Sequence, residues 1–136
     1  MPAAIADLRT GLSDALSTIN GLRVYEVLPD NPNPPAATIS LGRVAYDSTL
    51  ARGCDMFEFT ITVIVGRADD RTAQTRLEAY IAGSGSASVK TAVEDDPTLG
   101  GHAQVVRVSE AGNIATLDRA DGTSFMIVDF AVTIHA

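Results

Sequence analysis

The sequence predicts an α+β domain, a mostly antiparallel sheet with an N-terminal helix and two central helices packed on it. Two segments alternate apolar and polar side chains with the two-residue period of a strand, one in the middle of the chain and one at its end. Helical periodicity is confined to the beginning and the centre of the chain. The resulting order of helix, strands, two helices and strands is typical of an α+β domain.

The first predicted element is an amphipathic helix over residues 3 to 19. Its apolar residues recur at steps of three or four and form one stripe: Ile5, Leu8, Leu12, Leu16 and Ile19. Asn20-Gly21 ends the pattern, because glycine commonly follows the last residue of a helix.

Two short strands are predicted on either side of a proline-rich loop. They cover residues 22 to 28 (LRVYEVL) and 38 to 43 (TISLGR), and are candidates for pairing across the loop. The loop, DNPNPP at 30 to 35, lacks the backbone donors of a continuous ladder and is predicted to be exposed.

The segment from 44 to 55, VAYDSTLARGCD, has no clean period and is predicted to be a loop between two strands. Loops of this length are often functional or become ordered on a partner. Tyr46, Leu50 and Arg52 are candidate interface residues, since the segment carries residue types found in protein interfaces.

The central strand, within Met56 to Ala68, is the best-defined element. Its apolar row is Phe57, Phe59, Ile61, Val63 and Val65. Ile64 interrupts the polar row of Glu58, Thr60 and Thr62, which indicates that the second face is covered at its far end by a helix or another copy of the chain.

Two helices are predicted after the central strand. Asp69-Asp70 offers N-cap carboxylates to a helix over residues 70 to 82, whose buried side is predicted to contain Ala73, Leu77, Tyr80 and Ile81. A flexible link, GSGSAS, leads to a second short helix over 88 to 95, which Pro97 stops.

The last third is predicted to be strands at 103 to 110, 114 to 119 and 123 to 136, with Asp121-Gly122 as a hairpin turn. In the final strand the apolar row is Met126, Val128, Phe130, Val132 and Ile134. Because this row is as regular as that of the central strand, we expect the two strands to lie near each other in one sheet.

Composition limits the function classes. The 136 residues fit a single domain, and no apolar run approaches the length of about 20 residues that spans a bilayer. The N-terminus does not resemble a secretory signal, and the single cysteine, Cys54, excludes an internal disulfide and a multi-cysteine metal site. A net charge of −7, with scattered arginines and one lysine, argues against binding to a nucleic-acid backbone.

No catalytic, cofactor-binding or metal-binding set is predicted. Only His102 and His135 could act as a histidine base, and both are expected in exposed positions without Cys/His metal spacing. The glycine-serine link lacks the lysine of a phosphate-binding loop, and the aspartates near Gly122 lack the ligand count of a calcium loop.

Glu94-Asp95-Asp96 places three carboxylates at a predicted helix C-terminus, where the helix dipole disfavours negative charge. Either solvent screens them or an arginine meets them. The second possibility makes Asp95 and Asp96 candidates for a contact with a neighbouring subunit.

Four segments carry a resemblance to a known family. They are the N-terminal helix leading into GLRVY (21–25) with Pro29 after it, the proline loop before TISLG (38–42), FEFTITVIV followed by DDRTAQTRLEAYI (69–81), and VKTAVEDDPTLGG (89–101) before VVRV. In their order and spacing they resemble the tail terminator proteins of long-tailed, siphovirus-like bacteriophages or phage-derived particles. That family commonly has an aromatic residue where this chain has Ala36-Ala37.

The resemblance implies a virion structural protein, not an enzyme, located at the tail neck and assembled in the host cytoplasm. Such a protein forms a homohexameric ring on the major tail tube protein, ends polymerisation of the tube and offers a surface to the head-neck connector or stopper protein. DNA passes without specific binding, and no membrane or cofactor is involved.

The interface residues that we predict lie in the proline loop, the 44-to-54 loop and the acidic helix end: Asn31, Pro32, Pro35, Tyr46, Leu50, Arg52, Asp95 and Asp96. Two alternatives stay open. One is another neck protein, such as a head-closure or head-tail joining component, and the other is a small hydrolase-like enzyme with a pocket lined by His102 and acids.

Overall fold

The computed structural model describes residues 5–19, 22–25, 36–46, 55–67, 71–83, 85, 87–95, 98–99, 103, 105–118, 122 and 124–135. The elements in chain order are α1 (Ile5–Leu16), β1 (Arg23–Tyr25), β2 (Ala36–Ala45), β3 (Met56–Arg67), α2 (Arg71–Ile81), α3 (Val89–Glu94), β4 (Val105–Asp118) and β5 (Ser124–His135). This order confirms the predicted α+β class. Among the described residues, no helix is long and apolar enough to cross a membrane.

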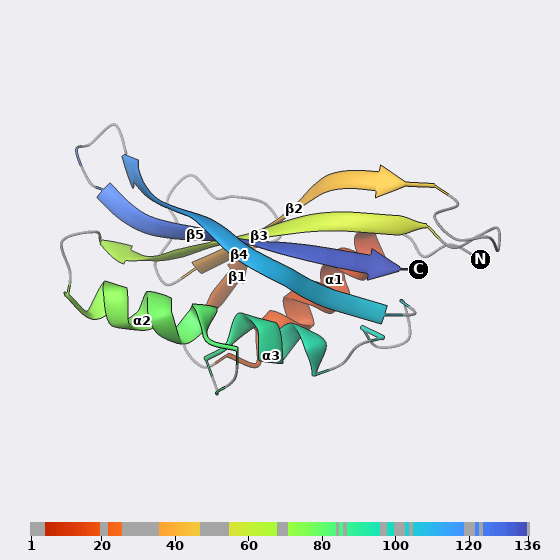
Figure 1. Ribbon diagram of the computed structural model, residues 1–136, viewed down its shortest axis with the longest axis horizontal. Coiled ribbons are helices and arrows are strands. Elements are labelled where there is room, and N and C mark those ends of the chain that lie inside the picture. Colours follow the sequence, from red (N-terminus) through yellow and green to blue (C-terminus); the bar gives the residue numbers. More distant parts are fainter. Residues whose placement is uncertain are drawn as a thin grey trace.

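The described strands form one five-stranded sheet in the order β1-β2-β3-β5-β4. β1 and β2 are parallel and the other neighbours are antiparallel, so the sheet is mixed but mostly antiparallel. All three helices lie on one side of the sheet (Figure 1). The molecule therefore has two layers, one of strands and one of helices.

The centre of the sheet is the pair β3 and β5, as their matching periodicity predicts. Phe59 lies opposite Val132 and Ile61 opposite Phe130, so the two apolar rows face the same side. A slip of one residue would turn one of these rows to the other face and expose it to water. The burial of both rows consequently specifies a single register.

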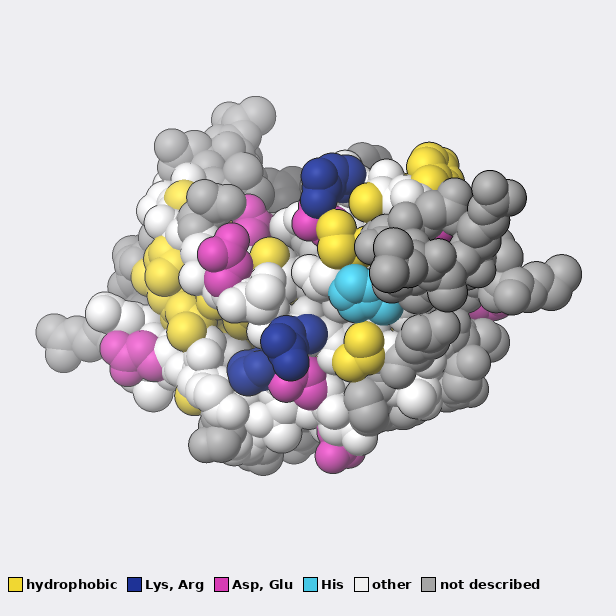
Figure 2. Space-filling model, turned by 45° about the vertical axis from the view of Figure 1, so that its right-hand side comes forward, with side chains coloured by type: hydrophobic (Ala, Val, Ile, Leu, Met, Phe, Trp, Pro, Cys, Tyr) yellow, Lys and Arg dark blue, Asp and Glu magenta, His cyan; other side chains and the backbone are white. Residues whose placement is uncertain are grey.

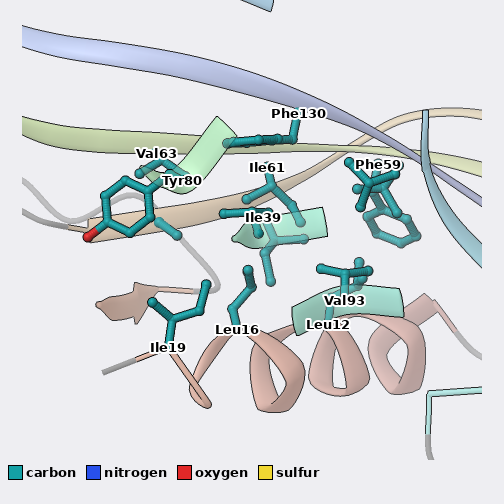
Figure 3. Close-up of a cluster of buried hydrophobic side chains, with 14 of the residues drawn as sticks. Leu12, Leu16, Ile19, Ile39, Phe59, Ile61, Val63, Tyr80, Val93 and Phe130 are labelled. Carbon is teal, nitrogen blue, oxygen red and sulfur yellow. The ribbon is translucent and has the colours of Figure 1, made fainter. Parts of the chain in front are cut away.

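The helix layer covers the apolar rows of the sheet. The α1 stripe of Leu8, Leu12 and Leu16 is fully buried, and Figure 3 shows Leu12 and Leu16 pointing from α1 toward the side chains of the sheet. Along the sheet, α1 contacts β1 and β2, α2 contacts β3 and β5, and α3 contacts β4. Each helix thus shields a different part of one continuous core.

Two close contacts hold the helices in place. Ser88 is the N-cap of α3: its Oγ accepts a hydrogen bond from the Thr91 N–H at 3.2 Å and donates one to the Ala82 carbonyl at 2.5 Å. On α1, a Cβ added at Gly11 would lie 2.9 Å from the Cβ of Leu99. Leu99 itself is buried with a φ of 49°, a strained backbone for leucine.

Several element boundaries differ from the predicted ones. The segments at 103–110 and 114–119 are parts of one strand, β4, because irregularities at Ser109 and between Gly112 and Ala115 absorb the breaks in periodicity. The α1 helix ends at Leu16, and a turn rather than a helix carries Ile19 into the core. Val44 and Ala45, predicted as loop, extend β2.

Ile64 is 1% exposed in the isolated chain, so its burial does not require another copy. It pairs with Ala36 on β2 and Ile127 on β5.

The predicted pairing of the strands that flank the proline loop is confirmed, with β1 and β2 in parallel.

Candidate functional site: the open face of the sheet

The side chains that alternate with the core rows form a second face of the sheet. Its far end, with Ala36, Thr38 and Ile64, is buried, and we call the rest of it the open face. It lies opposite the helix layer (Figure 1). Its half-buried and exposed members come from all four long strands: Ser40, Arg43, Glu58, Thr60, Thr62, Arg107, Asp129, Ala131, Thr133 and His135. Polar side chains can face water on an antiparallel sheet that is packed on one side only.

Mostly apolar residues form one end of this face, next to a predicted interface residue. Ala45, Met56, His135 and Val105 follow one another across β2, β3, β5 and β4. Tyr46 comes directly after Ala45 and is 77% exposed, and Val105 is 41% exposed. We call Ala45, Tyr46, Met56, Val105 and His135 the Tyr46 end. Exposed apolar side chains gathered at one place often mark a contact surface.

The next row is charged but internally paired. The Arg43 guanidinium donates from Nε to one Glu58 carboxylate oxygen at 2.8 Å and from a terminal nitrogen to the other at 3.1 Å. This two-pronged geometry matches the planar fork of arginine to the carboxylate. Figure 2 likewise shows basic side chains (dark blue) next to acidic ones (magenta), so the visible surface has no extended field of one sign.

A hollow of about 410 Å³ lies in the middle of the open face. The residues that line it come from the same four strands: Gly42, Arg43, Glu58, Phe59, Thr60, Ser109, Glu110, Ala131, Val132 and Thr133. The strand irregularities between Leu41 and Arg43 and between Val108 and Glu110 flank it on opposite sides. Bulges bend and twist a strand, and the small residues Gly42 and Ala131 leave room between them.

Deeper along the open face, polar side chains satisfy one another. The Thr62 hydroxyl donates to the Asp129 carboxylate at 2.7 Å, and these residues are directly opposed on β3 and β5. A hydrogen bond between cross-strand partners holds both side chains in place. The open face is therefore an ordered polar surface, with its hollow between this pair and the Tyr46 end.

The edge of the sheet beside the open face is partly closed by α3. The Glu94 carboxylate accepts a hydrogen bond from the backbone N–H of Val108 at 2.9 Å and another from the Lys90 ammonium at 2.6 Å. Burial raises the pKa of Glu94, but these hydrogen bonds and the charges of Lys90 and Arg107 outweigh it and hold the pKa below its ordinary value. Glu94 is thus paired with a lysine of its own chain. The sequence-based possibilities were only screening by solvent or contact with an arginine.

The structure describes two of the predicted interface residues. Tyr46 protrudes at the end of the open face, and Asp95 is the exposed C-cap of α3. The other predicted interface residues lie outside the described residues: Asn31, Pro32, Pro35, Leu50, Arg52 and Asp96. Tyr46 and Asp95 come from different elements, and neither lines the hollow.

The two histidines are also divided between described and undescribed parts. His135 is half-buried in the row of the Tyr46 end, not exposed as predicted, because Met56 and Val105 flank it on the neighbouring strands. His102 lies outside the described residues. The described part of the chain contains no group of three or more His, Cys, Asp or Glu side chains placed to hold a metal ion.

Sequence reasoning missed the hollow and its Arg43–Glu58 rim. Alternation placed Glu58 on the polar face, but only the register of β2 against β3 shows that Arg43 is its partner.

No protein-family model matches this chain, and comparison with curated proteins finds no significant relative.

Proposed function

We propose that this protein is a tail terminator, a virion structural protein whose copies form a homohexameric ring on the major tail tube protein. The ring ends polymerisation of the tube and provides the surface for the head-neck connector or stopper protein. The observation that supports this role best is the asymmetry of the sheet: helices cover one face, while the other carries a hollow and the protruding Tyr46 end. The order of the resembling sequence segments supports it independently.

An open polar face alone is common in antiparallel sheets and would not require a partner. The apolar character of the Tyr46 end is what favours protein contacts, because tyrosine and other large side chains are enriched in interfaces. Tyr46 and Val105 are both large, exposed and at the same end of the sheet. Contacts of a head-to-tail kind between such surfaces generate closed rings when the rotation between copies is suitable.

The charge of the chain fits a ring through which DNA moves. A net charge of −7 per copy gives a ring of six a strongly negative total. Negative charge on the wall of the channel would repel the phosphate backbone and let the genome slide. This hypothesis requires weak DNA binding; tight binding of duplex DNA by the assembled ring at physiological salt would contradict it.

The described hollow fits a contact surface better than a hydrolase active site. Two of its three charged lining residues, Arg43 and Glu58, are bound to each other, and none of its lining residues is a histidine. The remaining alternative, a head-closure or head-tail joining protein, would also form a ring but would sit on the connector side instead of on the tube.

The proposed function is tested by adding the purified protein to polymerising tube protein. We expect tubes whose growth stops, with a ring of the added protein at one end, and a mass of six chains for the isolated ring. A tube protein from an unrelated phage serves as the control and should elongate unchanged. Binding to the connector without any effect on tube growth would instead favour the head-closure alternative.

A further inference from the structure

We infer that Tyr46 of one copy inserts into the open-face hollow of the next copy. This inference rests on the proposed ring and identifies which surfaces would meet in it. The starting observation is that Tyr46 is mostly exposed to solvent. It is 77% exposed and is not among the residues that line the hollow. An aromatic ring of this kind contributes a large contact area when a partner covers it.

The hollow has the size for one inserted side chain. Its volume of about 410 Å³ is near the lower end of the roughly 300–1,000 Å³ of small-ligand pockets. A folded element would not fit, whereas an aromatic side chain would. Gly42 helps to keep the hollow open, since a Cβ there would already come within 3.3 Å of the Glu58 carbonyl.

The lining of the hollow suits a phenol. Ala131 offers an apolar contact, and the Glu110 carboxylate and the hydroxyls of Thr60 and Thr133 offer acceptors for the phenol O–H. Two hydrogen bonds to Glu58 orient the guanidinium of Arg43. A planar guanidinium can stack on an aromatic ring while its edge stays paired with a carboxylate.

The positions of the two surfaces favour a head-to-tail contact between copies. Tyr46 follows the last residue of β2 at the end of the sheet, while the hollow lies across the middle of the open face. Because the two surfaces differ, each copy can use its own tyrosine on one neighbour and its hollow on the other, which is the arrangement that closes a ring.

The open face is also large enough to contribute to a specific interface. Four strands about 4.8 Å apart and seven residues at about 3.3 Å each cover roughly 440 Å² per copy, or about 900 Å² with the partner's share. Specific interfaces bury at least about 1,000 Å², so the open face supplies most of the area that such a contact needs.

The test places the photoreactive residue benzoylphenylalanine at position 46 and mixes tagged with untagged chains. After illumination of the assembled protein, we expect links between different copies, located by mass spectrometry on Thr60, Ala131 or Thr133. The same residue at position 114 is the matched control, because Ile114 is also large and 57% exposed but lies on β4, away from the hollow. Position 114 should give no links to the hollow.

Two sets of variants test the contact without the probe. Tyr46→Ala should weaken ring association by at least about tenfold, as expected for a central aromatic anchor, while Ile114→Ala should change it less than about twofold. Filling the hollow with Ala131→Phe, or with Thr133→Phe if the first does not fold, should weaken ring association by a similar factor. Thr116→Phe, exposed and outside the hollow, is the control for added size.

Hexamers that form normally with Tyr46→Ala, or links from position 46 that avoid the hollow, would overturn the inference while leaving the ring itself intact. Links from position 46 to the tube protein would also overturn it, because the tyrosine would then serve the tube contact. A protein that stays monomeric and unlinked rejects the inference, and the tube-capping assay then decides the proposed function separately.

Discussion

On the covered face of the sheet, Phe59, Ile61 and Phe130 are at most 1% exposed, whereas on the open face Glu58, Thr60 and Asp129 keep contact with solvent. The two sets alternate along the same strands, β3 and β5, so their backbones belong to the same antiparallel ladder. What differs is the helix layer. The covered face supplies the hydrophobic stabilisation of the fold, and the open face is left to form contacts with other molecules.

The largest expected effect is truncation of the core. Phe130→Ala should lower the free energy of unfolding by about 3–5 kcal/mol, because it removes buried contacts and leaves a cavity. Thr133→Ala on the open face of the same strand should change it by less than about 0.5 kcal/mol. Urea unfolding of both variants measures the difference. Equal losses would mean that the open face also carries much of the stability.

The second effect concerns the close approach of the helix layer. Gly11→Ala should destabilise the protein by about 1–2 kcal/mol, since overpacking against Leu99 outweighs the gain in helix propensity. Thr10→Ala, exposed on the same helix, is the matched control and should be neutral or slightly stabilising. In a Leu99→Gly background, which loses a buried side chain together with the clashing Cβ, Gly11→Ala should cost less than in the wild type. Thermal and urea unfolding of these variants test this.

A third effect comes from Glu94 at the edge between the two faces. Its pKa is lowered in the folded chain, so the group contributes stability that is fully present above its unfolded pKa and is lost as the pH falls through the folded pKa. Since the group is partly exposed, the contribution should be at most about 1 kcal/mol. The measurement is the difference in unfolding free energy between the wild type and Glu94→Gln from pH 7 down to pH 3.

That difference should be constant near neutral pH and shrink below the ordinary glutamate pKa of about 4.3. Glu110→Gln is the control, since Glu110 is exposed on β4, the strand whose Val108 N–H donates to Glu94. A difference that grows as the pH falls would contradict the assigned direction of the pKa shift.

The smallest expected effect is on the open face itself. A double-mutant cycle on Arg43→Ala and Glu58→Ala should give a coupling of about 0.2–1 kcal/mol that decreases with added salt, because both side chains are substantially exposed. If Tyr46 stacks on this pair in the ring, the same cycle measured on ring association should give a larger coupling than the one measured on unfolding. Equal coupling energies would mean that the Arg43–Glu58 pair does not take part in the interface.

The sequence is most informative for elements in which the spacing of apolar residues indicates that one side is buried. The row of β3 and most of the row of β5 and of the α1 stripe were predicted correctly, because the periods of strands and helices are local geometry. Ile5, also assigned to the stripe, is 38% exposed. β4 was wrongly divided, since a bulge shifts the alternation and looks like a loop in the sequence. Tyr46 was selected by residue type and is exposed, but nothing in the sequence indicated a hollow on the same sheet.

The sequence alone therefore determined which residues had to be buried, the class of the fold and the negative charge of the surface. Tertiary structure decided which face the three helices cover, that Arg43 meets Glu58, and that four strands surround a hollow. The physical reason is that periodicity is a property of neighbouring residues, whereas register and the choice of a face depend on contacts between segments far apart in the chain.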